Sequence, residues 1–143
     1  MARAATIGNG SILVAFDDRG QVRDFYYPYV GHANHISGAS GVYGHQVGVW
    51  VDGQFAWLND SSWHIHIDTH PEQMNTIITA ENSRLQVRLQ FKDIVHNEQN
   101  IYLRNIIIDN QSDSERTIKL FFGQQFRISE SRRGDTGIYD PRV

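Results

Sequence analysis

The chain has 143 residues, of which 40% are hydrophobic and 20% charged, and it contains no cysteine. This length suits one domain with its own core, and the apolar content excludes a disordered tail. The lack of thiols excludes a disulfide scaffold and a cysteine-based zinc site. A formal net charge of −3 gives no basic patch, and no apolar run is long enough to span a bilayer. The charge and the short apolar runs lead us to expect no nucleic-acid and no membrane partner. The N-terminus lacks the apolar core of a signal peptide, so we expect a cytoplasmic protein.

Strand patterns dominate the chain. Apolar or alternating runs between turn signals predict nine strands, at residues 11–16, 21–26, 47–51, 55–58, 63–68, 76–80, 84–91, 101–108 and 117–126. Asp52-Gly53 is a strong signal for a two-residue hairpin turn. No stretch of ten residues has helical spacing with caps at both ends. We therefore expect an all-β fold with no substantial helix, an antiparallel β-sandwich in which residues 1–143 form a single unit.

The longest irregular segment, residues 27–41, is the main candidate for a functional loop. Four aromatic residues occur within residues 25–29, and polar residues follow them. Aromatic faces stack on sugar rings, whereas amides and imidazoles bond sugar hydroxyls. The alternative is that the aromatic side chains anchor a long loop to the core. The residues expected to contact carbohydrate or a neighbouring domain are Tyr27, Tyr29, His32, Asn34 and His35.

Histidines and tryptophans suggest two further chemistries. His64 and His66 are two residues apart on a predicted strand, a spacing that can bind a metal ion. The candidates for a third ligand are His32, His35, His45 and His70. The alternative is a solvent-facing strand, which also has polar residues at alternate positions. Three tryptophans, Trp50, Trp57 and Trp63, could line a carbohydrate platform or fill the core. No carboxylate pair has a diagnostic spacing. We therefore predict no catalytic residue, no metal site and no cofactor.

Several short motifs keep the order and spacing of one known pattern over about residues 6–60. They are Ile7-Gly8-Asn9-Gly10, residues 13–17, Arg23 to Gly31, Asn34-His35, residues 48–53 and Trp57-Leu58. In these motifs the chain resembles the start of the N-terminal domain of prokaryotic glucoamylase-type enzymes, which belong to glycoside hydrolase family 15. The later strands fit that domain only in general character.

The resemblance implies a super-β-sandwich in front of an (α/α)6-barrel that hydrolyses α-glucosidic oligosaccharides with inversion. Both catalytic glutamates of such enzymes lie in the barrel, so we expect this chain alone not to be catalytic. Its role would be to support the barrel of the same polypeptide, and an oligosaccharide is a second expected partner. The alternatives are a free-standing carbohydrate-binding sandwich and a histidine-based metal protein of the cupin type.

The N-terminal sandwich of that family is considerably longer than 143 residues. We therefore expect the chain to stop part way through it, near Asp140-Pro141. An incomplete sandwich exposes strand edges, and exposed edges pair readily with other strands. Self-association through such edges is therefore a further expectation.

Overall fold

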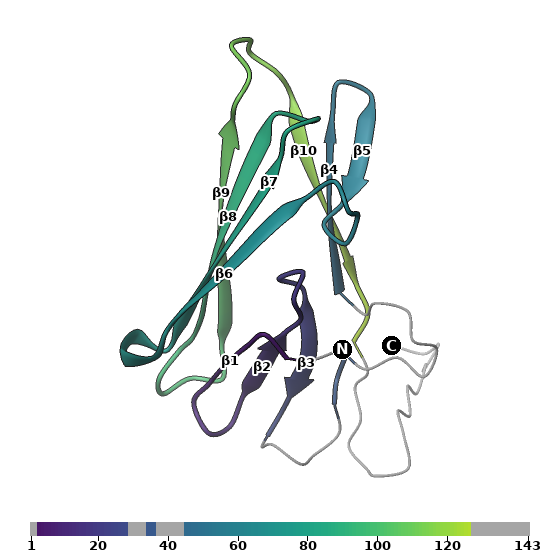
Figure 1. Cartoon of the computed structure of the whole chain (residues 1–143). Coiled ribbons are helices and arrows are strands. Elements are labelled where there is room, and N and C mark those ends of the chain that lie inside the picture. The colour runs from purple at the N-terminus through teal and green to yellow at the C-terminus, as the bar shows by residue number, and fades with distance from the viewer. Residues whose placement is uncertain (1–2, 29–33, 37–44, 127–143) are drawn as a thin grey trace, which may run out of the picture.

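The computed structural model describes residues 3–28, 34–36 and 45–126 of the chain (Figure 1). These residues form ten strands and one short 3-10 helix. In chain order they are β1 (Ala5–Gly8), β2 (Leu13–Phe16), β3 (Val22–Tyr26), β4 (His45–Val51), β5 (Gln54–Trp57), β6 (His64–His70), η1 (Pro71–Gln73), β7 (Asn75–Asn82), β8 (Val87–Val95), β9 (Tyr102–Asn110) and β10 (Ile118–Gln124).

The strands form three antiparallel sheets. The largest has the order β6-β7-β8-β9, the second has the order β10-β4-β5, and the third has the order β1-β2-β3. In Figure 1 the β1-β2-β3 sheet lies near the end of the molecule opposite the β9–β10 connection. The all-β, antiparallel sandwich predicted from the sequence is confirmed, and the described residues contain no α-helix. None of them forms a helix that is long and apolar enough to cross a membrane.

One hydrophobic core joins the sheets. Alternate residues of β8 are buried, and so are Val47, Gly48, Val49 and Val51 of β4. The largest fully buried side chains include Phe16, Phe91, Leu58, Ile78 and Leu89. Because these residues come from different sheets, the core holds the sheets together as one body.

The strand predictions were right in type and differ mainly at the boundaries. The segment predicted as residues 84–91 begins as β8 at Val87, because residues 83–86 form the turn after β7. Asn82 Oδ1 accepts a 3.0 Å hydrogen bond from Leu85 N, and Gln86 has a φ of 49°. Asp52 and Gly53 have φ values of 50° and 77°, as the predicted hairpin turn requires.

The nine-strand prediction omitted β1. This strand pairs with β2 over four residues, from Ala5 opposite Phe16 to Gly8 opposite Leu13. The link between them is a turn in which Asn9 Oδ1 accepts hydrogen bonds from Ser11 N and Ile12 N. Four residues are too few for an alternation pattern to stand out, which is why the sequence did not reveal the strand.

Candidate functional site

The loop that follows β3 returns to that strand through Asn34. Its Oδ1 accepts hydrogen bonds from Phe25 N at 3.0 Å and Ile36 N at 3.2 Å. Its Nδ2 donates to Asp24 Oδ1 at 2.6 Å. Asp24 is buried and also accepts from Arg3 Nε at 2.6 Å. The side chain of Asn34 therefore fastens the loop to β3.

His35 and Tyr27 lie beside this anchor. His35 N donates to Phe25 O at 2.8 Å, and His35 Nε2 lies 2.9 Å from Tyr27 O. The Tyr27 side chain is 42% exposed, so it is accessible to a ligand or a neighbouring domain. Tyr29 and His32 lie outside the described residues. Contact of these five residues with carbohydrate or another domain stays a prediction.

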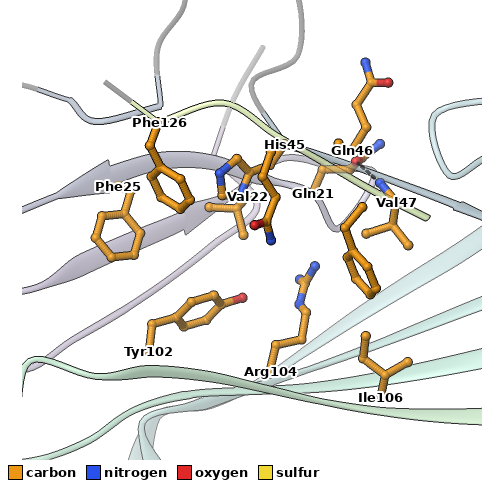
Figure 2. Close-up of a pocket in the computed structure, with 13 residues that line it drawn as sticks. Gln21, Val22, Phe25, His45, Gln46, Val47, Tyr102, Arg104, Ile106 and Phe126 are labelled. Carbon is orange, nitrogen blue, oxygen red and sulfur yellow. Dashed lines mark hydrogen bonds between the residues drawn. The ribbon is translucent and has the colours of Figure 1, made fainter. Parts of the chain in front are cut away.

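A cavity of about 300 Å³ lies where the three sheets meet, and residues in or next to β3, β4, β9 and β10 line it (Figure 2). Aromatic side chains line it from several elements, including Phe25, Tyr102, Phe122 and Phe126. In Figure 2 the guanidinium of Arg104 points from β9 into this space. The cavity therefore combines an aromatic wall with one buried cation.

The charge of Arg104 is neutralised by Asp93, which has no exposed surface. Arg104 Nε donates to Asp93 Oδ1 at 2.6 Å, and Nη2 donates to Oδ2 at 3.1 Å. The Tyr102 hydroxyl donates to Asp93 Oδ1 at 2.6 Å, and burial raises the pKa of Tyr102. The guanidinium also lies 4.7 Å from the centre of the Phe91 ring. These contacts make the pair a structural feature of the sandwich interior.

Two other polar groups at the cavity have unpaired atoms. Gln21 accepts a 3.1 Å hydrogen bond from Val47 N through Oε1, but its buried Nε2 has no partner among the described residues. His45 Nε2 is likewise buried and without a partner there. Burial, assisted by the charge of Arg104, lowers the pKa of His45 to about 4. The ring is therefore neutral near pH 7.

The histidines of β6 lie on the outer face of the largest sheet. His64 and His66 are exposed, whereas Ile65 and Ile67 pack against the core, as the alternation predicted. His66 Nε2 lies 3.1 Å from Asp68 Oδ1. Among the residues that the structure describes, no three histidine or acidic side chains gather closely enough to hold a metal ion. The arrangement matches the solvent-facing alternative.

An aromatic patch covers the outer face of the β10-β4-β5 sheet. It consists of Trp50, Phe55, Trp57 and Phe121. The Phe55 ring meets Trp57 edge-on at 4.7 Å and Phe121 at 5.6 Å. Gly48 lies beneath them, and a Cβ there would be 2.4 Å from Phe55 Cζ. Lys119 Nζ lies 4.7 Å from the centre of the Trp50 ring. Trp63, by contrast, is buried in the core, so the three tryptophans do not form one platform.

Sequence reasoning did not single out Asp93 or Arg104. A weak signal existed for both, because each is a charged residue at an inward position of an alternating strand. Their pairing depends on the β8–β9 register, which places Asp93 directly opposite Arg104. The sequence offered His45 only as a third metal ligand. Its place in the cavity wall was missed, because the strand predicted there began at residue 47, whereas β4 begins at His45.

Comparison with known proteins shows that the chain is similar to a glycosyl hydrolase. It is 30% identical, over 126 residues, to an uncharacterized glycosyl hydrolase of Methanocaldococcus jannaschii. The chain is related to a glycoside hydrolase. The match covers 87% of the chain but only 19% of that relative, so the chain spans about a fifth of the relative's length. No protein-family model matches the chain, and no solved structure matches it significantly.

The match supports the relation to glycoside hydrolases that the sequence motifs indicated. A glycoside hydrolase relative agrees with a carbohydrate-related β-domain, and the all-β structure is compatible with it.

Proposed function

We propose that this chain is a non-catalytic β-sandwich of a glucoamylase-like glycoside hydrolase acting on α-glucosidic oligosaccharides, and that it supports a catalytic barrel of the same polypeptide. The observation that carries the proposal is the match to a glycosyl hydrolase over 87% of the chain but only 19% of the relative. Much of that relative lies outside the match, which leaves room for a catalytic domain there.

The buried carboxylates support a non-catalytic role. A glycosidase needs two carboxyl groups facing each other across a substrate cleft. Asp17 instead accepts hydrogen bonds from Arg19 N and Gln21 N within a turn. Asp24 binds Arg3 and Asn34, and Asp93 binds Arg104 and Tyr102. Each of these three carboxylates makes hydrogen bonds to groups of the same chain that stabilise the fold.

The gene beyond the Val143 codon provides the first test. A reading frame that continues into a sequence with the pattern of a helical barrel supports the proposal, and a stop codon directly after Val143 contradicts it. The longer product should hydrolyse maltooligosaccharides, whereas residues 1–143 alone should not. Hydrolysis by residues 1–143 alone would overturn the non-catalytic assignment.

Within this proposal, the loop after β3 reaches the barrel or the substrate through Tyr27 and Tyr29. Replacing both tyrosines with alanine in the longer enzyme should change the kinetics on maltooligosaccharides or weaken domain docking. Asn105→Ala, on an exposed position of β9, is a matched surface control. Unchanged kinetics together with unchanged melting would contradict the role of the loop.

A second candidate function is a free-standing carbohydrate-binding module, which the aromatic patch favours. Phe55 and Phe121 are 38% and 45% exposed, and aromatic side chains are the usual stacking surface for sugar rings. Titration of the chain with maltoheptaose, followed by tryptophan fluorescence, separates the two functions. Saturable quenching that is lost in Trp57→Ala supports a binding module, and no quenching supports the scaffold.

A further inference from the structure

The cavity beside β3, β4, β9 and β10 is built from the inward faces of the sheets. On β9, alternate residues from 102 to 106 line it. On β10, Phe122 lies directly opposite Val47 of β4 and lines the cavity from the same face. Gln124 lies opposite His45 in the same way. The strand registers therefore place these side chains around one space, whereas the aromatic patch lies on an outer face.

One wall of the cavity consists of ring side chains in edge-to-face contact. The centre of the Phe25 ring lies 6.3 Å from that of Tyr102 and 6.1 Å from that of Phe126. The Phe126 ring in turn lies 4.7 Å from the His45 ring. Figure 2 shows these four rings around one side of the space, with the Arg104 side chain pointing into it. Such a wall gives a large contact area to another ring.

The cavity carries no net charge. Arg104 is the only charged residue among the described residues that line it, and Asp93 neutralises it through two hydrogen bonds. The His45 ring is neutral near pH 7, because burial lowers its pKa to about 4. An ion that entered this space would lose its hydration without gaining a free countercharge. The cavity therefore suits a neutral ligand.

Several polar atoms of the cavity wall are available for hydrogen bonds. Nη1 of Arg104 makes none with the described residues, while Nε and Nη2 are both engaged. Gln21 is only 2% exposed, and its Nε2 has no partner in the described part of the chain. His45 Nε2 is unpaired there as well. Because buried polar groups are normally paired, these atoms favour a ligand that carries polar groups of its own.

The wall offers both donors and acceptors. The guanidinium of Arg104 and the amide nitrogens need acceptor oxygens, whereas the amide oxygen of Gln124 needs a donor. A hydroxyl group is both donor and acceptor, so a ring with several hydroxyls can pair with all of them. A pyranose has these hydroxyls at its edge and C–H groups on its faces. A volume of about 300 Å³ is at the lower end of small-molecule sites and suits one such ring.

We propose that this cavity binds a single neutral hexose. The C–H face of the sugar packs on the rings of Phe25, Tyr102 and Phe126. Its hydroxyls pair with Arg104 Nη1 and with the Gln124 amide. This site belongs to the sandwich itself, so the inference goes beyond the supporting role proposed above and does not depend on a catalytic barrel. It is also separate from the outer aromatic patch.

Titration of the 143-residue chain with D-glucose, followed by backbone amide chemical shifts, tests the proposal. For a ligand of this size we expect saturation with a dissociation constant on the order of a few millimolar. The shifts should change in β9 and in residues 122–126, and they should stay constant in β5 and β6.

Phe126→Ala and Gln124→Leu test the two kinds of contact. Both side chains are exposed, so neither substitution empties the core. Phe126→Ala should raise the dissociation constant for glucose about ten-fold, and Gln124→Leu about three- to ten-fold. The matched controls are Phe121→Ala in the aromatic patch and Gln54→Leu on β5, the same changes at exposed positions outside the cavity. Both control variants should bind glucose like the parent chain.

Benzyl alcohol, a neutral ring with one hydroxyl, separates ring packing from hydroxyl pairing. Glucose should bind more tightly than benzyl alcohol, and the reverse order would overturn the assignment to a sugar. A lack of saturable glucose binding would overturn the site itself. Binding that is lost in Phe121→Ala but kept in Phe126→Ala would place the sugar on the outer patch and contradict the proposal. These outcomes leave the supporting role untouched, because that role is tested by the reading frame beyond the Val143 codon.

Discussion

Asp93 on β8 and Arg104 on β9 lie directly opposite each other and form a two-hydrogen-bond ion pair inside the sandwich. The pair is 0% exposed at Asp93 and 13% exposed at the Arg104 side chain. Removal of one partner from such a pair leaves a buried charge without compensation. We therefore expect Arg104→Leu to lower the free energy of unfolding by about 3–5 kcal/mol, as measured by urea denaturation.

The same ladder contains a matched control. Glu81 and Arg88 are also cross-strand partners, but their side chains are 47% and 44% exposed and lie 3.3 Å apart. Solvent screens this pair, so Arg88→Leu should cost less than about 1 kcal/mol. The double variant Asp93→Leu/Arg104→Leu should be more stable than Arg104→Leu alone. If Arg88→Leu and Arg104→Leu lower the free energy of unfolding equally, burial does not determine the cost of breaking these pairs.

Gly20 is a position where both the backbone and the packing require glycine. It has a φ of 69°, and an added Cβ would lie 2.5 Å from Cγ2 of the fully buried Ile78. Gly53 has a similar φ of 77° but open space around it. Gly53→Ala should therefore cost about 1–2 kcal/mol from backbone strain alone. Gly20→Ala should cost about 1–3 kcal/mol more, because it also overpacks the core.

Thermal or urea unfolding of the two glycine variants measures this difference directly. The Gly53 variant acts as the control for the left-handed backbone conformation. If the two alanine variants lose equal stability, the contact with Ile78 has relaxed and the packing argument is wrong.

Local patterns were enough to predict most of the fold. The Asp52-Gly53 turn and the outward histidines of β6 depend only on neighbours in sequence, and the structure confirms both. The pairing of Asp93 with Arg104 could not be predicted, because it depends on the register between two strands. The order of strands within each sheet, such as β10 beside β4, depends likewise on contacts between distant segments.

The role of the loop after β3 likewise depends on contacts that the sequence does not reveal. Its aromatic and polar residues are visible in the sequence, but the side chain of Asn34 serves three hydrogen bonds within the chain. A residue type that suits sugar binding equally suits loop closure, and only the positions of Phe25, Ile36 and Asp24 distinguish the two uses.

Asn34→Ala should therefore act on stability. The substitution removes the acceptor of Phe25 N and Ile36 N and the donor to Asp24. Partly buried groups left without a partner cost about 1–3 kcal/mol in total. Asn105→Ala, at an exposed position of β9, should change the free energy of unfolding by less than about 0.5 kcal/mol. A normal melting temperature for the Asn34 variant would contradict its role as an anchor.

His45 makes the stability of the fold depend on pH. Burial, assisted by the charge of Arg104, lowers its pKa in the folded state to about 4, from 6.5. The unfolded chain therefore binds a proton that the folded chain rejects, and stability falls as the pH drops from 6.5 to about 4. Above pH 6.5 the His45 ring is neutral in both the folded and the unfolded state, and the free energy of unfolding has its full value. Because the ring is only partly buried, we expect a loss of roughly 1–2 kcal/mol over this range.

His45→Phe removes the titration but keeps a ring beside Phe126, whose centre lies 4.7 Å from that of His45. Urea unfolding at a series of pH values should show a flatter profile for this variant than for the parent chain between pH 6.5 and 4. His64→Gln, at an exposed position of β6, should keep the parent profile and so controls for the loss of a histidine as such. Parallel profiles for the parent chain and His45→Phe would mean that the His45 ring is protonated equally in the folded and unfolded states. In that case the cavity beside β9 and β10 is open enough to water for the imidazolium to be solvated there.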